Sequence, residues 1–238
     1  MGYNHTDSKK TPLLSARLKL YLSNLFSKEL SAFIIGNSGF MQKPLKRYLK
    51  LTAFNRSFIL NDMESANLLA KNIALTDPLL TSAFNQYLNA GSLAKKRLIA
   101  AKILVDYPLV YPQIGKNFDE FANMPISNLK QIDNYRRNWV WGFTCIDDRY
   151  KPENFYESEV DKKITDTNPI NYLMKTVINY MIQNPSYSDP KLLHQIVNVG
   201  HYAACQDEET PDLSRQAFQL LHTRYPNTYW AKQTPYWY

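Results

Sequence analysis

Two histidines and a cysteine near the C-terminus have the residue types of a potential metal site. His194, His201 and Cys205 occupy positions i, i+7 and i+11 of one predicted helix, and at about 100° per residue their side chains fall within about 40° of one another. A zinc ion requires three or four ligands at about 2.0–2.3 Å, whereas residues seven positions apart are separated by about 10 Å along a helix axis. His201 and Cys205 would therefore need Cys145 or another residue to complete a site. The spacing favours histidines that pack at a helix interface, and we predict no metal and no cofactor.

The two cysteines of the chain, Cys145 and Cys205, leave two possibilities open. In an oxidising compartment they would form a disulfide that closes a loop of about 60 residues and stabilises the fold by a few kcal/mol. The alternative is a pair of free buried thiols. A cysteine–histidine nucleophile pair with His201 or His222 would need an orienting group and an oxyanion hole. No flanking motif supplies these, and the acidic run at 207–209 is expected to be solvated, so we predict no catalytic residue.

Basic residues outnumber acidic residues by 28 to 21, and the excess lies in the first half of the chain. Such an excess suits an acidic partner, or it is a solvated surface without a partner. A nucleic-acid surface would need aromatic residues interleaved with the basic ones for stacking, so we favour a protein or peptide partner over nucleic acid. The residues predicted to bind it lie on two predicted helices and are Lys46, Arg47, Lys50, Lys95, Lys96 and Arg97.

Apolar residues recur with helical spacing between proline and glycine breaks. Leu14, Leu18, Leu22 and Leu25 form the stripe that is typical of an amphipathic helix. The 7 glycines and the apolar share of 45% indicate a helical, globular chain. We predict helices over residues 12–31, 44–60, 62–75, 76–89, 92–106, 169–184, 188–205 and 211–224, a further helix capped by Ser127, and a long polar connection over residues 145–168.

Polar residues mark where several of these helices begin and which way they face. Asp62 and Ser92 precede apolar stripes and have the side chains of N-cap residues. In the helix predicted over residues 44–60, apolar side chains such as Leu49 and Phe58 are expected to face inward. The charged side chains of that helix are expected to face solvent, or to lie along the apolar surface with only their charged ends in solvent. They are Lys46, Arg47, Lys50 and Arg56.

Residues 44–106 form two predicted helix–turn–helix units, which start at Pro44 and Asp77. Their length of about 31–34 residues is that of tetratricopeptide-like repeats. We therefore predict an all-α fold in which antiparallel helix pairs stack as a tetratricopeptide-like array. Its parts form one continuous unit and are basic helical pairs over residues 12–110, an irregular connection with one helix over residues 111–168, and a C-terminal helical pair with an aromatic cap over residues 169–238.

The C-terminal segment carries a longer pattern, SRQAFQLLHTRYPNTYWAKQTPYWY, from Ser214 to Tyr238. This segment resembles the end of an uncharacterised family of bacterial extracytoplasmic helical-repeat proteins, whose members end in AFxLLHxxYP…WAxxTPYW. The surroundings of Cys205, and of Trp139 and Cys145, resemble that family more loosely. The resemblance implies a helical-repeat fold and an extracytoplasmic, periplasmic location, and it implies no activity.

Two features of the sequence bear on the compartment. No stretch approaches the roughly 20 apolar residues that are needed to span a bilayer, and the N-terminus shows no apolar region of a signal peptide. The extracytoplasmic location therefore depends on the resemblance, and a cytoplasmic location is the alternative.

Three hypotheses for function stay open, because no catalytic or nucleotide-binding motif is visible. The first is a helical-repeat scaffold that binds a protein or peptide on a concave face. The second is a hydrolase of cell-envelope polymers, with a site in residues 134–168 near Arg136, Arg137 and Asp147. The third is a structural part of a larger envelope protein. A deep pocket with converging polar groups in residues 134–168 would favour the enzyme, and an open groove would favour the scaffold.

Overall fold

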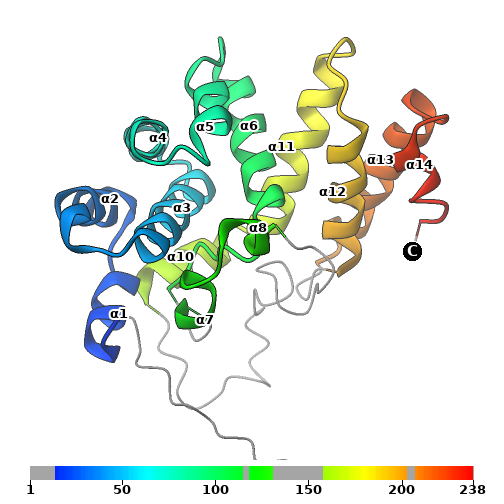
Figure 1. Ribbon diagram of the computed structural model, residues 1–238. Coiled ribbons are helices and arrows are strands. Elements are labelled where there is room, and N and C mark those ends of the chain that lie inside the picture. Colours follow the sequence, from blue (N-terminus) through cyan, green and yellow to red (C-terminus); the bar gives the residue numbers. More distant parts are fainter. Residues whose placement is uncertain (1–13, 115–117, 131–157, 203–206, 238) are drawn as a thin grey trace, which may run out of the picture.

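The computed structural model describes residues 14–114, 118–130, 158–202 and 207–237 (Figure 1). In these ranges the chain forms helices and no strand, so the prediction of an all-α fold is confirmed. None of the helices in these ranges has both the length and the hydropathy of a membrane span. The α-helices are α1 (Ala16–Ser23), α2 (Ser27–Gly36), α3 (Lys43–Ile59), α4 (Met63–Thr76), α5 (Thr81–Leu88), α6 (Leu93–Asp106), α7 (Phe118–Ala122), α8 (Ile126–Leu129), α10 (Glu159–Asp166), α11 (Pro169–Gln183), α12 (Pro190–Tyr202), α13 (Glu209–Arg224) and α14 (Tyr229–Lys232), and a short 3-10 helix, η1, covers Ser38–Phe40.

Two of the predicted N-caps are present as expected. Asp62 caps α4 by accepting a hydrogen bond from the amide of Ser65 at 3.0 Å. Ser92 caps α6 in the same way and accepts from the amide of Lys95 at 3.1 Å. Both caps satisfy amide groups that a helix leaves unpaired in its first turn. The end of α6 also agrees with the prediction, because the residue before Pro108 is disfavoured in helical geometry.

The single helix predicted over residues 12–31 is wrong, because the chain breaks there into α1 and α2. Asn24 ends α1 by donating a side-chain hydrogen bond back to the preceding turn, which is a local competitor of helix continuation. The carbonyls of Leu22 and Leu25 accept hydrogen bonds from Arg56, and the carbonyl of Leu22 also accepts from the amide of Leu25 at 3.4 Å, in the turn that follows α1. The apolar stripe crosses this break without interruption, and periodicity alone therefore predicts one helix.

Two further helix starts differ from the prediction. α5 begins at Thr81 rather than at residue 76, because Asp77 organises a turn in front of it and accepts from the amide of Leu79 at 3.2 Å. α8 begins directly after Pro125, so Ser127 lies inside the helix and is not its cap.

The connection predicted over residues 145–168 contains a helix in its described part, α10. Ser158 caps α10 by accepting a hydrogen bond from the amide of Asp161 at 3.0 Å. Val160 and Ile164 are fully buried. These two apolar residues are too few to form a recognisable stripe in a polar segment. The prediction of a connection without helix is therefore wrong for these residues.

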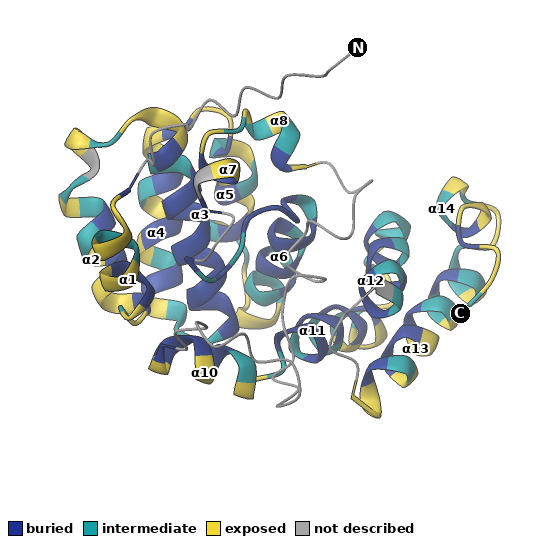
Figure 2. Ribbon diagram, turned by 90° about the horizontal axis from the view of Figure 1, so that it is seen from below, coloured by how far each residue is buried: buried dark blue, intermediate teal, exposed yellow. Residues whose placement is uncertain are grey.

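The helices form a curved row in which neighbours along the chain pack side by side (Figure 1). α2 to α6 follow one another in contact, α11 then packs against α6, and α12 and α13 continue the row. Figure 2 shows that buried residues line the sides where neighbouring helices meet. α11 packs directly on α6 although many residues separate the two helices in sequence, so the row of helices is not interrupted between them. The tetratricopeptide-like geometry of the predicted repeats stays a prediction.

At Gly200, α12 lies close to both α11 and α13. A Cβ atom at this position would lie 2.6 Å from Cβ of Ser214 in α13 and 2.9 Å from Cε of Met174 in α11. Favourable contacts between carbon atoms lie at about 3.5–4.0 Å. The observed approach of these three helices therefore requires a residue without a side chain.

Arg56 of α3 lies in the middle of the packing and has no exposed surface. Its Nε donates to the carbonyl of Pro112 at 3.0 Å, and its Nη1 donates to the carbonyls of Leu25 and Leu22 at 2.6 and 3.3 Å. Burial lowers the pKa of Arg56 to about 10, although the charge of Asp161 acts in the opposite direction. The guanidinium thus joins α3 to the end of α1, to the residues before α2 and to the segment after α6.

The prediction that Arg56 and Lys50 face solvent is wrong, since the exposed fractions of these residues are 0% and 3%. α3 packs against α2, α4, α6, α7 and α11. Residues 48–59 of α3 are all buried, so this part of the helix has no solvent face for its charged residues. Leu49 and Phe58 are buried as predicted.

We expect Arg56→Met to lower the free energy of unfolding by about 3 kcal/mol, because buried carbonyls lose their donor while most of the side-chain volume is kept. Urea denaturation followed by far-UV circular dichroism measures this change. Arg17→Met makes the same substitution at an exposed position of α1 and should alter stability by less than about 0.5 kcal/mol. Equal stability of the two variants would contradict the role given to Arg56.

Candidate functional site

Two of the three basic residues predicted on α3, Arg47 and Lys50, join this helix to the end of α4. Arg47 forms an ion pair with Asp77, in which Nη2 lies 3.0 Å from Oδ1. Lys50 donates from Nζ to Oγ1 of Thr76 at 2.7 Å. Burial lowers the pKa of Lys50, repulsion from Lys46 lowers it further, and Asp77 acts in the opposite direction. The charges of Arg47 and Lys50 are engaged inside the fold, and partner binding by α3 stays a prediction.

The basic residues predicted on α6 turn to three different neighbours. Lys95 places Nζ 3.6 Å from the ring centre of Tyr187, which is a cation–π contact. Lys96 donates to Oδ1 of Asn67 in α4 at 3.0 Å. Arg97 lines a groove between α6 and α11. The three predicted residues therefore do not form one basic surface.

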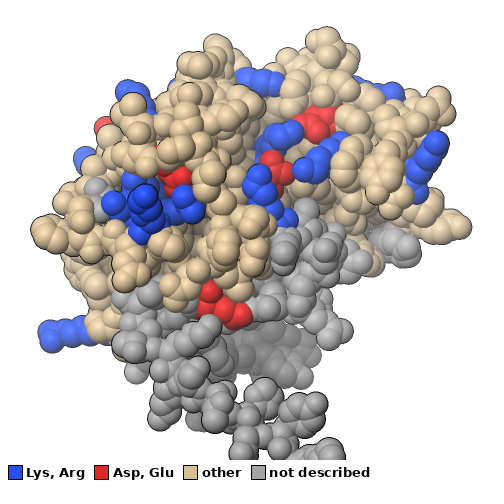
Figure 3. Space-filling model, in the orientation of Figure 1, with Lys and Arg blue, Asp and Glu red and all other residues tan. Residues whose placement is uncertain are grey.

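Figure 3 shows two groups of Lys and Arg atoms on one face, each of which also contains Asp or Glu atoms, while other Lys and Arg side chains lie singly. When opposite charges lie this close together, the electrostatic potentials that they produce farther from the surface largely cancel. This face therefore lacks the continuous basic surface that non-specific binding to nucleic acid requires. Ion pairs in the described ranges include Arg47 with Asp77, Lys102 with Asp189, and Lys191 with Asp106.

The candidate functional site is the groove between α6 and α11, which we call the α6–α11 groove. Its volume is about 230 Å³, below the roughly 300–1,000 Å³ of sites for drug-sized ligands and cofactors. The contact between α6 and α11 forms its base. It is lined by Ala94 and Arg97 of α6 and by Tyr172, Lys175, Thr176, Asn179, Tyr180 and Gln183 of α11.

The two cations that line the α6–α11 groove differ in their pairing. Nζ of Lys175 lies 2.7 Å from Oε2 of Glu209, and both side chains are about half exposed, so the pair is weak. Arg97 donates from Nη2 to Oδ1 of Asn61, a neutral amide, at 2.7 Å. Among the residues that the structure describes, no carboxylate forms an ion pair with Arg97. The groove thus contains a positive charge without a counter-charge from these residues.

Two donors beneath the α6–α11 groove have no hydrogen-bond partner in the described ranges. They are Nε–H of Arg97 and the hydroxyl of Tyr172, and both atoms are shielded from solvent. Burial raises the pKa of Tyr172, and the charge of Arg97 acts in the opposite direction, so the two groups interact electrostatically. A buried donor without an acceptor costs about 1–3 kcal/mol. Such groups are uncommon in folded proteins, and each calls for an explanation such as a bound water or ion.

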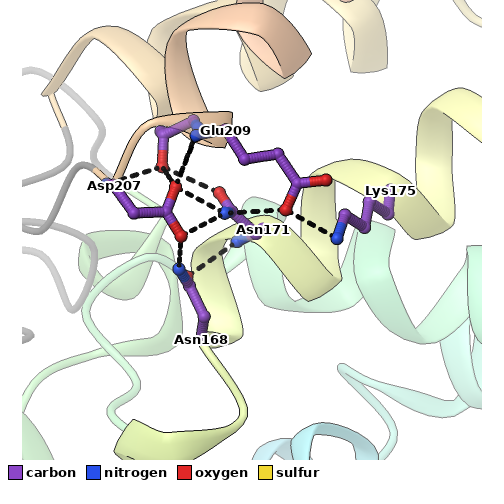
Figure 4. Close-up of polar contacts among 6 residues, drawn as sticks. Asn168, Asn171, Lys175, Asp207 and Glu209 are labelled. Carbon is purple, nitrogen blue, oxygen red and sulfur yellow. Dashed lines mark hydrogen bonds and ion pairs between the residues drawn. The ribbon is translucent and has the colours of Figure 1, made fainter.

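A polar cluster at the start of α13 holds α13 against α11 (Figure 4). Oδ1 of Asp207 accepts hydrogen bonds from the amides of Glu209 and Thr210, each at 3.0 Å, and so satisfies two amides in the first turn of α13. The same carboxylate accepts from Nδ2 of Asn171 at 2.8 Å and from Nδ2 of Asn168 at 2.6 Å. Burial alone would raise the pKa of Asp207, but the hydrogen bonds from Asn171, Thr210 and Glu209 lower it overall.

The same cluster positions Lys175 at the α6–α11 groove. Glu209, which pairs with Lys175, also lies 3.4 Å from Nδ2 of Asn171. Asn168 caps α11 with a positive φ of 42°, a backbone conformation that asparagine adopts more readily than most residues. Figure 4 shows these side chains converging from the starts of α11 and α13. The start of α13 therefore contacts one charged residue of the groove.

His194 packs between α12 and the C-terminal tail. Its Nδ1 lies 2.7 Å from Oγ1 of Thr234, and its Nε2 lies 3.0 Å from Nδ2 of Asn198. The hydroxyl of Thr234 donates to the carbonyl of Trp230, so it accepts from Nδ1–H, and Nε2 accepts from Asn198. The neutral imidazole is therefore satisfied at both nitrogens. Burial lowers the pKa of His194, and the charge of Lys191 lowers it further.

The aromatic tail packs back on α12 and α13 through α14. The ring centres of His194 and Trp230 lie 5.2 Å apart. Nε2 of His222, on α13, lies 2.7 Å from the carbonyl oxygen of Thr234. Both long helices thus contact the same short tail, which is the arrangement expected of a cap.

Several predicted residues lie outside the described ranges. Cys145 and Cys205 are among them, so the possible disulfide stays a prediction. Arg136, Arg137 and Asp147 of the hydrolase hypothesis also lie outside. Within the described ranges, no group of three or more His, Cys, Asp and Glu residues is arranged to hold a metal ion. Because these ranges contain neither cysteine, this finding does not test a site that includes Cys205.

A second hollow, of about 350 Å³, lies between α11 and α13. Arg224 in its lining donates from Nη1 to the carbonyl of Met181 at 2.6 Å. None of its lining residues has a buried donor that lacks a partner in the described ranges. The α6–α11 groove is therefore the stronger candidate.

The sequence identifies one residue of the α6–α11 groove, Arg97, and misses those of α11. A polar stripe on a helix normally indicates a face in solvent, and the packing of α6 beside this stripe is not visible in the local sequence. The signal in the sequence that could have found this face is a set of polar and tyrosine residues that recur every three or four positions. These residues are Tyr172, Lys175, Thr176, Asn179 and Gln183.

Comparisons with protein-family models, with curated proteins and with solved structures give no match for this chain. The resemblance of the C-terminal segment to an extracytoplasmic family therefore stays a prediction, and function is argued from geometry.

We expect Asp207→Asn to lower the free energy of unfolding by about 1 kcal/mol at neutral pH. Because folding lowers the pKa of Asp207 below its ordinary value of 3.8, the carboxylate stabilises the fold above that value, and the effect disappears as the pH falls through the folded-state pKa. Urea denaturation at a series of pH values should show the two proteins converging in acid. The control is Asp212→Asn, at an exposed position of the same helical turn. A gap that does not depend on pH would contradict this account.

Histidine side-chain NMR should show that His194 is neutral, protonated on Nδ1, and titrates below its ordinary pKa of 6.5. Since the unfolded chain then binds the proton more readily, the stability that this residue contributes should decline as the pH falls below 6.5. The spectrum of His194→Gln assigns the signal, and the same sample in urea provides the unfolded reference. An Nε2–H tautomer, or a pKa at or above the unfolded value, would be inconsistent with the hydrogen bonds described.

Proposed function

We propose that the protein is a helical scaffold that binds a segment of another protein in the α6–α11 groove. The observation that carries this proposal is a polar groove between two packed helices that is too small for a typical cofactor. Such a groove suits one or two side chains of a larger partner, whose remaining residues lie over the surrounding surface.

The side chains along α11 suit a peptide main chain. Asn179 and Gln183 are both exposed and line the groove, and each amide offers donors and an acceptor. Residues four apart on a helix are separated by about 6 Å along the axis, and alternate residues of an extended peptide repeat at about 6.6 Å. Tyr180 provides an aromatic wall, and tyrosine is a common contact residue in binding surfaces. These features support recognition of an extended segment.

An enzymatic function receives less support from the α6–α11 groove. Its lining contains no histidine, cysteine or carboxylate, which are the usual nucleophiles and general bases. The hydrolase hypothesis for residues 134–168 stays a prediction, because most of that segment lies outside the described ranges.

For the compartment, we propose an extracytoplasmic location, with a cytoplasmic location as the alternative. The support is the resemblance of residues 214–238 to the C-terminal pattern of extracytoplasmic helical-repeat proteins.

We expect a random linear-peptide display library, selected against the full chain, to yield peptides that bind in the α6–α11 groove. Ala94→Trp places an indole in the groove and should weaken these peptides about tenfold or more in fluorescence anisotropy. Ala32→Trp makes the same change at an exposed position of α2 and should leave their affinity within about twofold. A selection that enriches no peptide, or peptides that bind Ala94→Trp as well as the original chain, would contradict the proposal.

A further inference from the structure

The charge of the α6–α11 groove restricts which chemical groups a partner could place in it. Of the two lining cations, Lys175 is already paired with Glu209. Arg97 is held through Nη2 by the neutral Asn61, and no carboxylate of the described residues pairs with it. A single added negative charge would therefore balance the lining.

We propose that the α6–α11 groove selects the carboxylate of a Glu or Asp side chain in an acidic segment of the partner protein. Arg97 supplies the cation, and the Tyr172 hydroxyl supplies a further donor. This inference depends on the proposed function of the groove as a peptide site.

The unpaired donors support a carboxylate in particular. Guanidinium groups bind carboxylates through two parallel N–H groups. Within the described ranges Arg97 donates only one N–H, through Nη2, so the N–H groups of Nη1 and the second N–H of Nη2 are available, whereas Nε–H is shielded from solvent. The hydroxyl of Tyr172 is buried at the same groove without an acceptor. A ligand carboxylate is acceptor-only and offers both oxygens. It therefore complements two donors that the described residues leave unpaired.

The surroundings favour an acidic peptide over a neutral one and a monoanion over a dianion. Nζ of Lys95 lies 5.1 Å from the ring centre of Tyr180, which forms a wall of the groove, and so adds positive potential beside it. Glu209 lies against Lys175 and would repel a second negative charge on a ligand. A carboxylate therefore fits the lining better than a phosphate group, which carries about −1.5 to −2 charges at neutral pH.

The test uses three pools of fluorescein-labelled heptapeptides with neutral flanking residues and Glu, Gln or phosphoserine at the centre. Fluorescence anisotropy with the full chain at physiological ionic strength should show the Glu pool binding about tenfold more tightly than the Gln pool. The phosphoserine pool should bind no more tightly than the Glu pool. Arg97→Gln should remove the difference between the Glu and Gln pools.

A pair of tyrosine variants tests the groove without disturbing a known contact. The hydroxyls of Tyr172 and Tyr87 are both buried without a partner in the described ranges, but Tyr87 lies in α5 and does not line the groove. Tyr172→Phe should weaken the Glu pool about fivefold and leave the Gln pool unchanged. Tyr87→Phe should change neither pool. Urea denaturation of both variants confirms that each is folded.

The outcomes separate this inference from the proposed function. If the Gln pool binds as tightly as the Glu pool while Ala94→Trp blocks both, carboxylate selection is wrong and peptide binding stands. If Ala94→Trp affects neither pool, both proposals fail. Tighter binding of the phosphoserine pool, or equal effects of Tyr172→Phe and Tyr87→Phe on the Glu pool, would also overturn the carboxylate assignment.

Discussion

The guanidinium of Arg56 joins three stretches of chain around α3, and the arrangement of the first half of the molecule depends on it. Its carbonyl partners belong to the end of α1, to the residues before α2 and to the segment after α6. A buried charge that loses its partners costs several kcal/mol, so these carbonyls must keep their positions while the helix stays buried. The same residue therefore holds the break between α1 and α2 and the segment that follows α6 in place around α3. Since α6 forms one wall of the α6–α11 groove, the core of the fold and the candidate site share this constraint.

The existence of most helices could be predicted from sequence because their apolar residues repeat with helical period between proline and glycine breaks. The errors occur where tertiary contacts override that local pattern. The break between α1 and α2 needs a donor from α3, and α10 depends on burying two residues in a polar segment. Arg56 and Lys50 are inside because α3 is surrounded by other helices. A list of apolar stripes contains none of this information, since it treats each helix as if one of its faces met solvent.

The candidate site was predictable only in part. The run of Lys95, Lys96 and Arg97 is visible in the sequence, but successive residues of a helix point about 100° apart, and only Arg97 lines the groove. The residues of α11 that complete the site are far from α6 in sequence, and nothing local indicates that these two helices pack together. The unpaired hydroxyl of Tyr172 is also a property of its surroundings rather than of its neighbours in sequence. The charge of the site was therefore accessible from the sequence, whereas its shape was not.

At Gly200 the absence of a side chain sets the spacing of α11, α12 and α13. Ser214 and Met174 occupy the space that a side chain at this position would fill. A methyl group there would act as a wedge between α12 and α13. His194 on α12 and His222 on α13 both hold the tail at Thr234, so a wedge would pull the two anchor points of the tail apart. The glycine therefore sets the spacing of the helices to which the C-terminal tail is attached, and the docking of the tail depends on that spacing.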